Sequence, residues 1–137
     1  MAAVSGTGRF MQDGNRIIRV ERLIKKEVAD VLASRVTEPD IRGVTVLWVK
    51  VSRDLRYADI YVSVFGDEGE VARGLKALAR CRPFVQKEVG TRVRLRRTPH
   101  IRFRLDKEYR KAVRVFEILK ELEADGLPGG GEDSGSD

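Results

Sequence analysis

Apolar residues in the first third of the chain follow the period of an α-helix. They recur at steps of three and four residues, as one buried helix face requires. The positions are Ile17, Val20, Ile24, Val28 and Val31. Asn15 is a suitable N-cap, and the pattern stops near Ser34, ahead of a loop that contains proline and glycine. We therefore predict a helix from Arg16, capped by Asn15, to about Ser34, preceded by residues 1–13, which are small and polar and expected to be disordered.

The next apolar positions alternate, which is the pattern of β-strands. Two such runs, Val44–Ser52 and Arg56–Gly66, are separated by a short turn, so they are predicted to form an antiparallel hairpin. One face of the second run is uniformly apolar: Ala58, Ile60, Val62 and Val64. The opposite face carries Tyr57, Asp59, Tyr61, Ser63 and Phe65. The helices are therefore expected to pack on the first face.

A second helical pattern extends from Val71 to Val89, and it contains a proline. Asp67 can cap its start, and the acidic residues that follow suit the positive end of the helix dipole. Pro83 removes an internal hydrogen bond and clashes with the preceding turn, at a cost of about 3 kcal/mol in a continuous helix. We therefore predict two helices, or one sharply bent helix, with the break at Ala79–Arg82.

The rest of the chain predicts one more strand and one more helix. Pro99 introduces a strand with Ile101, Phe103 and Leu105 on the core side. A helix follows from about Lys107 to Glu123, and one face of it carries Tyr109, Val113, Phe116, Leu119 and Leu122. A strand that returns to the sheet through helices is expected to pair in parallel.

The predicted order is thus helix, strand, strand, helix, break, helix, strand, helix. This order gives an α+β domain with a three-stranded mixed sheet and helices on one face. We expect the domain to span residues 14–123. Residues 124–137 have the acidic, glycine-rich composition of a disordered tail.

Charge is distributed unevenly along the chain. The formal net charge is +6, but residues 121–137 contain six acids and no base. Residues 1–120 therefore hold 27 basic and 15 acidic residues, a net charge of +12. The positive charges of residues 1–120 repel one another, which destabilises a compact fold. A polyanionic partner, most commonly nucleic acid, is the simplest physical reason for the chain to retain these charges. The alternative is that lysine and arginine only keep the surface soluble.

Residues suited to catalysis are scarce in the sequence. His100 is the single histidine, and it follows a proline at a strand start with no nucleophile beside it. Cys81 lies between two arginines, which can lower a thiol pKa, but its place in an apolar-periodic run favours a half-buried structural thiol. The sequence has no metal-ligand spacing, phosphate-binding loop or dinucleotide motif, so we predict no catalysis, no cofactor and no metal. Its GxxG stretches, Gly66–Gly69 and Gly126–Gly129, lie among acids that would repel phosphate.

Basic residues cluster in the proline-containing helical run and the segment after it. Residues 71–104 include 11 bases and one acid. Alternation with Val93 and Leu95 predicts an extended row of arginines that point outward, and guanidinium groups both bind phosphate in bidentate fashion and stack on unpaired bases. The predicted RNA-binding residues are Arg73, Lys76, Arg80, Arg82, Lys87, Arg92, Arg94, Arg96 and Arg97.

The outer face of the predicted sheet is a second candidate for RNA binding. Aromatic and basic side chains share this face: Trp48, Lys50, Tyr57, Tyr61, Arg102 and Arg104. Such a platform can stack bases. The alternative is that the tyrosines are ordinary cross-strand neighbours on a solvated face, and Asp59 in their midst weakens the case for RNA.

Two segments resemble the ribosome-binding factor A family of bacteria. They are VKVSRDLRYADIYVSVFGD (Val49–Asp67) and FVQKEVGTRVRLRRTPHIRF (Phe84–Phe103), and the latter includes the specific stretch LRRTP. The resemblance covers about residues 14–122 and implies a type II KH-like domain. It also implies binding to the small (30S) ribosomal subunit and its 16S rRNA during late maturation and rRNA end processing, a role often important for growth in the cold and not enzymatic.

The resemblance further implies a kinked helix–helix junction with an Ala-x-Gly pattern in place of GxxG. Counted back from Gly90, these positions fall on Cys81, Arg82 and Pro83. Cysteine is small enough to replace alanine, whereas proline in place of glycine departs from the family pattern. The helix break is therefore expected to be produced by proline.

Two functional hypotheses remain open beside a disfavoured enzyme built on Cys81 or His100. The first is a non-catalytic factor whose partners are 16S rRNA and the immature 30S subunit. The second is a protein–protein module whose basic face docks acidic partners. No apolar run approaches the roughly 20 residues of a membrane span, so we expect a cytoplasmic protein, monomeric and without a small-molecule substrate. The acidic tail either aids solubility or competes with RNA for the basic surface.

Overall fold

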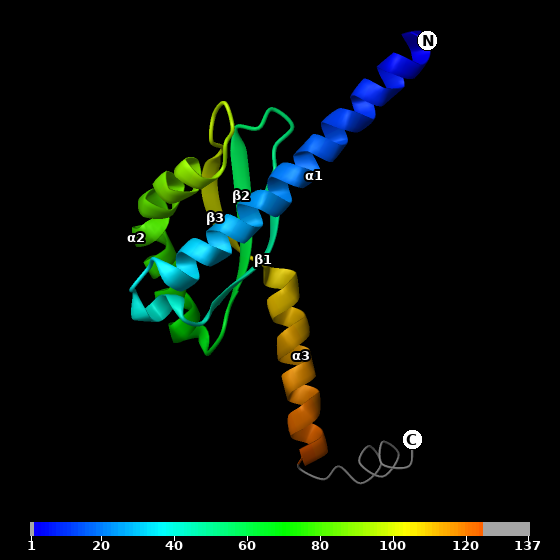
Figure 1. Ribbon diagram of the computed structural model, residues 1–137. Coiled ribbons are helices and arrows are strands. Elements are labelled where there is room, and N and C mark those ends of the chain that lie inside the picture. The colour runs from blue at the N-terminus through cyan, green and yellow to red at the C-terminus, as the bar shows by residue number, and fades with distance from the viewer. Residues whose placement is uncertain (1, 125–137) are drawn as a thin grey trace. The chain divides into compact units, whose positions relative to one another are not determined.

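A computed structural model describes residues 2–124, and for residues 2–13 it describes the backbone alone. The chain forms two compact units divided between Leu105 and Asp106, and each is described by itself. The first unit contains α1 (Ala2–Ser34), the 3-10 turn η1 (Pro39–Ile41), β1 (Val44–Val51), β2 (Tyr57–Val64), α2 (Glu68–Arg92) and β3 (His100–Leu105) (Figure 1). The second contains α3 (Lys107–Ala124). The tail expected over residues 124–137 lies outside the described residues after Ala124.

The three strands form one mixed sheet in the order β1-β2-β3. β1 and β2 pair antiparallel, and β2 and β3 pair in parallel, as predicted from the hairpin and the returning strand. The turn between β1 and β2 is closed by hydrogen bonds to the Ser52 side chain, and it places Leu55 at a positive φ of 60°. Helices and sheet together confirm the predicted α+β class.

α1 and α2 cover the same face of the sheet and enclose the core with it. Every predicted apolar position of α1 from Val20 to Val31 is buried. The fully buried side chains also include Ile60 and Val62 of β2, Leu78, Val85 and Val89 of α2, and Ile101 of β3. Burial of a side chain of this size contributes about 1.5–3 kcal/mol, so the shared face fixes both helices on the sheet.

The first half of α2 approaches β2 closely. A Cβ atom on Gly74 would lie 2.7 Å from Cγ1 of Val64, so only glycine permits this approach. The start of the helix is fixed by a reciprocal capping box: Asp67 accepts from the Glu70 amide at 2.8 Å, and the Glu70 carboxylate accepts from the Asp67 amide at 3.0 Å. The predicted N-cap at Asp67 is therefore confirmed.

α1 is longer than the sequence pattern predicted. It begins at Ala2, whereas we expected residues 1–13 to be disordered and the helix to start at Arg16 after an Asn15 cap. The apolar pattern reports burial against the sheet, and that burial does start near Ile17. A helix once nucleated extends backwards by one hydrogen bond per residue, and residues 2–13 contain no proline to stop it.

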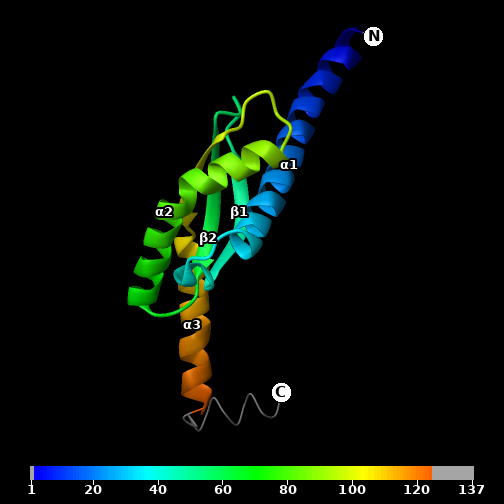
Figure 2. The same cartoon turned by 60° about the vertical axis from the view of Figure 1, so that its left-hand side comes forward.

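α2 is one helix, and the predicted division into two helices is wrong. Cys81, Arg82 and Pro83 all lie inside Glu68–Arg92. Figure 2 shows that α2 changes direction along its length, so the chain adopts the alternative of one bent helix. Val85 and Val89, buried beyond the proline, hold the second half of the helix against the core. Proline therefore bends α2 without ending it.

The second unit is the helix α3. Its range agrees with the predicted Lys107–Glu123 to within one residue. Asp106 caps its start, because its side chain accepts a hydrogen bond from the Tyr109 amide at 3.0 Å. None of its residues is buried. No helix among the described residues has the length and apolar character needed to cross a membrane.

Candidate nucleic-acid interface

The nine predicted RNA-binding residues fall on two adjoining elements. Six of them belong to α2, and three belong to the loop that connects α2 to β3, residues 93–99 (the α2–β3 loop). Val93 is buried and Leu95 is half-buried, as the alternation predicted. Arg92, however, is the last residue of α2 and does not belong to an extended row. The row therefore reduces to Arg94, Arg96 and Arg97, called here the loop arginines.

Arg92 is held by acidic residues of the protein itself. Its guanidinium lies 2.7 Å from Asp30 and 3.3 Å from Glu27, both on α1, and 4.0 Å from Glu88 one turn back on α2. The hydrogen bond to Asp30 is the largest of the effects that raise the pKa of Arg92. Its side chain is only 25% exposed. Arg92 therefore fixes the end of α2 to α1 and has little capacity left for phosphate.

Three more arginines of α2 also have partners within the protein. Arg80 forms an ion pair with Glu38, in the loop before η1. Arg73 lies 4.0 Å from Asp40 of η1. Arg82 donates to the main-chain oxygen of Ile101 at 3.4 Å. These contacts join α2 to the segment after α1 and to β3, so the three arginines are only partly available to a ligand.

The remaining five bases have no carboxylate at ion-pair distance among the described residues. They are Lys76, Lys87 and the three loop arginines, and all five are exposed. Lys76 and Lys87 are separated by about three turns of 3.6 residues, which places them on similar sides of α2. These five residues form the part of the predicted site that is open to a polyanion.

The α2–β3 loop is anchored at its far end by Gln86, which the sequence analysis did not single out. The Gln86 side chain donates to the Pro99 oxygen at 2.9 Å and accepts from the Ile101 amide at 2.7 Å. It thus bonds the outer edge of β3 as a neighbouring strand would, and it limits pairing with other chains. Gly90 adds a close approach, since a Cβ there would lie 3.2 Å from the Thr98 hydroxyl oxygen. The loop arginines therefore project from a segment with a fixed exit and a fixed return.

The two groups considered for catalysis, Cys81 and His100, belong to α2 and β3, and the first is buried whereas the second is exposed. Cys81 is buried, and burial is the main cause that raises its pKa above the ordinary thiol value of 9.0. Its thiol donates to the Leu78 oxygen at 3.6 Å, so the neighbouring arginines do not activate it. His100 is exposed at the start of β3 and meets Tyr57 edge-on, with ring centroids 6.2 Å apart. The described residues contain no group of three potential metal ligands.

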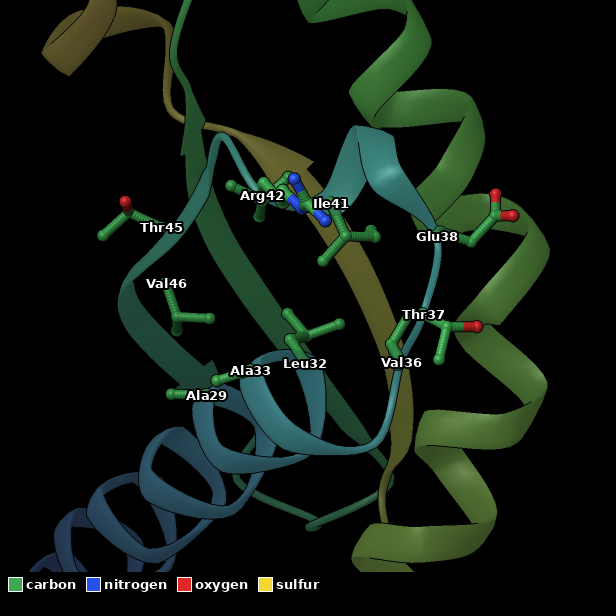
Figure 3. Close-up of a pocket in the computed structure, with 11 residues that line it drawn as sticks. Ala29, Leu32, Ala33, Val36, Thr37, Glu38, Ile41, Arg42, Thr45 and Val46 are labelled. Carbon is green, nitrogen blue, oxygen red and sulfur yellow. The ribbon is translucent and has the colours of Figure 1, made fainter.

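A pocket of about 570 Å³ lies between the end of α1, η1 and the first half of β1 (Figure 3). Its wall is largely apolar and includes Leu32, Val36, Ile41 and Val46. Glu38 is the carboxylate of this wall, and Figure 3 shows it pointing toward α2, where it meets Arg80. The polar residues of the wall also include Thr37, Arg42 and Thr45.

Known proteins are similar to this chain in sequence and in fold. The sequence matches the model of a family described as "Ribosome-binding factor A" over residues 16–119. The crystal structure of ribosome-binding factor A from Thermus thermophilus is similar at 27% identity and a TM-score of 0.58, over 65% of this chain and 93% of that one. The solution structure of a putative ribosome binding factor A from Thermotoga maritima is similar at 32% identity and a TM-score of 0.58, over 65% of this chain and 85% of that one. The expected KH-like fold is thereby confirmed.

Proposed function

Because the chain belongs to the ribosome-binding factor A family, we propose that it binds the 16S rRNA of the immature 30S subunit during late maturation and rRNA end processing, without catalysis. The observation that carries this proposal is the set of five exposed bases that have no internal carboxylate among the described residues, Lys76, Lys87 and the loop arginines. We expect the protein to act in the cytoplasm, as a monomer.

The loop arginines are suited to phosphate by chemistry and by placement. A guanidinium group presents a planar fork of donors that matches two phosphate oxygens. Gln86 and the close approach of Gly90 to Thr98 fix the far end of the loop, and the buried Val93 fixes its start, so less conformational entropy is lost when it binds. RNA phosphates supply the counter-charge that the described part of the protein does not provide to these side chains.

Salt dependence measures how many of the nine candidates contact phosphate. Each contact contributes about −0.9 to the slope of log K against log salt on a duplex, and somewhat less on a single strand. If only the five open bases make contacts, the slope is no steeper than about −4.5. A slope near −8 would instead require the internally paired arginines to change partners on binding.

The decisive experiment compares two triple variants that lose the same charge. In the first, Arg94, Arg96 and Arg97 are replaced by alanine; in the second, Arg16, Arg19 and Arg22 of α1, which are also exposed, are replaced by alanine. Binding to 16S rRNA and to immature 30S subunits is measured across a salt series. The loop variant should lose up to about 2.7 units of slope, and the α1 variant should retain most of its affinity. Equal losses in the two variants would show that total charge matters and not this site.

The alternative, a module that docks acidic proteins, is separated by ribonuclease treatment. Purified immature subunits are digested, and binding of the protein to the released ribosomal proteins is measured before and after digestion. RNA recognition predicts that binding disappears with the RNA. Binding that persists after digestion and still depends on the loop arginines would favour the acidic partner.

A further inference from the structure

The face of the sheet opposite the helices carries an ordered grid of polar and aromatic side chains. The strand register places Trp48, Tyr61 and Arg104 in one row and Lys50, Asp59 and Arg102 in the next. Tyr57 and His100 form a third row. Side chains two residues apart on a strand point to the same face, so these rows form one continuous surface.

Two of these rows contain rings in defined contacts. Trp48 and Tyr61 stack in parallel, with centroids 4.0 Å apart and an interplanar angle of 3°. The Arg102 guanidinium lies over the Tyr57 ring, 4.4 Å from its centroid. Trp48 is 43% exposed although it is stacked. The Trp48–Tyr61 pair is therefore a preformed stack that another flat ring can extend.

Asp59 does not oppose an anion on this face, because its charge is neutralised within the grid. Its carboxylate lies 2.7 Å from Arg102 and 3.2 Å from Arg104, and its side chain is only 16% exposed. With Lys50 directly across from it, the face holds three bases against one acid. The acid that weakened this site in the sequence thus orders two arginines beside the rings, and the net charge of the grid remains positive.

We infer that this outer face is a second RNA contact, which takes an unpaired nucleobase of a single-stranded segment onto the Trp48–Tyr61 stack. Lys50 and Arg104 flank the stack and are placed to meet the adjacent phosphates, Arg104 only in part because it shares Asp59 with Arg102. Stacking accepts any base, because every base has a π face, so the site selects for single strands more than for sequence. The inference depends on the proposed function insofar as the ligand is RNA, and it adds a contact that the loop arginines do not make.

Trp48 is the single tryptophan of the chain, so its fluorescence reports on this face alone. The wild-type protein is titrated with hexauridylate and, separately, with inorganic polyphosphate of similar charge, which has no bases. A stacked uracil should quench Trp48 emission, whereas polyphosphate should bind the basic surface without quenching. Quenching by both, or by neither while hexauridylate binding is seen by anisotropy, would overturn the inference.

Two substitutions at the same position test whether the ring is what matters. Trp48→Leu keeps an apolar side chain and removes the aromatic face, whereas Trp48→Phe keeps a ring. With labelled hexauridylate, affinity should fall roughly ten-fold in the leucine variant and be largely retained in the phenylalanine variant. Equal affinity in both variants would remove stacking from the mechanism.

Different results would contradict the RNA contact on the outer face of the sheet and the proposed function, so the two proposals can be tested separately. If the outer face plays no part, Trp48→Leu leaves hexauridylate binding unchanged, while the loop-arginine variant still loses affinity for 16S rRNA. If the proposed function is wrong, neither hexauridylate nor 16S rRNA is bound above the level of polyphosphate. Unaltered melting temperatures for both Trp48 variants show that any loss of affinity comes from the surface and not from unfolding.

Discussion

Arg92 and Arg94, the first of the loop arginines, are separated by a single residue, yet the protein uses them differently. Arg92 contacts carboxylates on α1 that lie more than 60 residues earlier in the chain, and it fastens one helix to another. Arg94, Arg96 and Arg97 have no carboxylate at ion-pair distance among the described residues. A cluster of basic residues in a sequence therefore contains two groups. One group, called here committed, forms ion pairs within the fold, and the other remains available to a ligand.

Paired and unpaired basic residues also occur together on α2. Arg80 and Arg73 contact the segment between α1 and β1, whereas Lys76 on the same helix has no acidic partner among the residues described. The charge that a nucleic acid can use is therefore smaller than the net charge of the sequence suggests. Whether an arginine is committed depends on which acids the fold brings to it.

The largest expected effect on stability distinguishes Arg92 from Arg94. Arg92→Met removes the cation beside Glu27, a carboxylate that is less than a fifth exposed, whereas Glu88 keeps Arg35 at 3.7 Å. Unpaired charges of this kind destabilise the fold, so the urea midpoint should fall clearly. Arg94→Met removes the same charge from an exposed side chain and should leave the midpoint unchanged. Equal midpoints for both variants would abolish the distinction drawn between them.

A committed arginine should become available when its acidic partner is neutralised. Glu38→Gln frees Arg80, which then adds up to about 0.9 to the salt slope and raises RNA affinity roughly a few-fold. Glu68→Gln is the matched control, because Glu68 is exposed on α2 and has no ion pair in the described structure. If the control raises affinity as much, the gain reflects lower negative charge in general and not the release of Arg80.

A smaller effect separates guanidinium chemistry from charge at the loop. Replacing Arg94, Arg96 and Arg97 with lysine retains three positive charges but removes bidentate binding and stacking. The salt slope should then stay the same, while affinity falls by roughly a few-fold, less than in the alanine variant. A lysine variant as weak as the alanine variant would mean that geometry, and not counterion release, provides most of the binding.

Local patterns in the sequence predicted most of the fold. The hairpin, the parallel return and the Asp67 cap each depend on residues near one another in the chain, and each is confirmed. The predicted bend of α2 is present, but the predicted division into two helices failed, because the cost of Pro83 is local, whereas the packing of Val85 and Val89 that offsets it comes from the sheet. The early start of α1 was missed because the apolar pattern marks only the part of the helix that faces the core.

Only part of the candidate site could be predicted from the sequence, because the rest depends on contacts between distant segments of the chain. The sequence located the basic cluster, but the acids that commit Arg92 come from α1 and cannot be assigned without the fold. Asp59 was placed on the correct face, yet its contacts with Arg102 and Arg104 depend on the strand register. Gln86 gave no signal at all, since a glutamine on a helix surface is ordinary.

The smallest expected effect concerns Cys81, whose two neighbours in the sequence are both arginines. Burial raises the pKa of the folded thiol above 9.0, and Arg80 offsets this only slightly. Well below pH 9 the thiol is protonated in the folded and the unfolded state, so burial of the neutral thiol contributes fully to stability. Above pH 9 the unfolded chain loses this proton first, and the contribution declines as the pH rises through the folded pKa. The difference in urea midpoint between wild type and Cys81→Ala should therefore stay constant up to pH 9 and shift against wild type above it. A shift that appears near pH 7 would mean that the flanking arginines, and not burial, control the thiol.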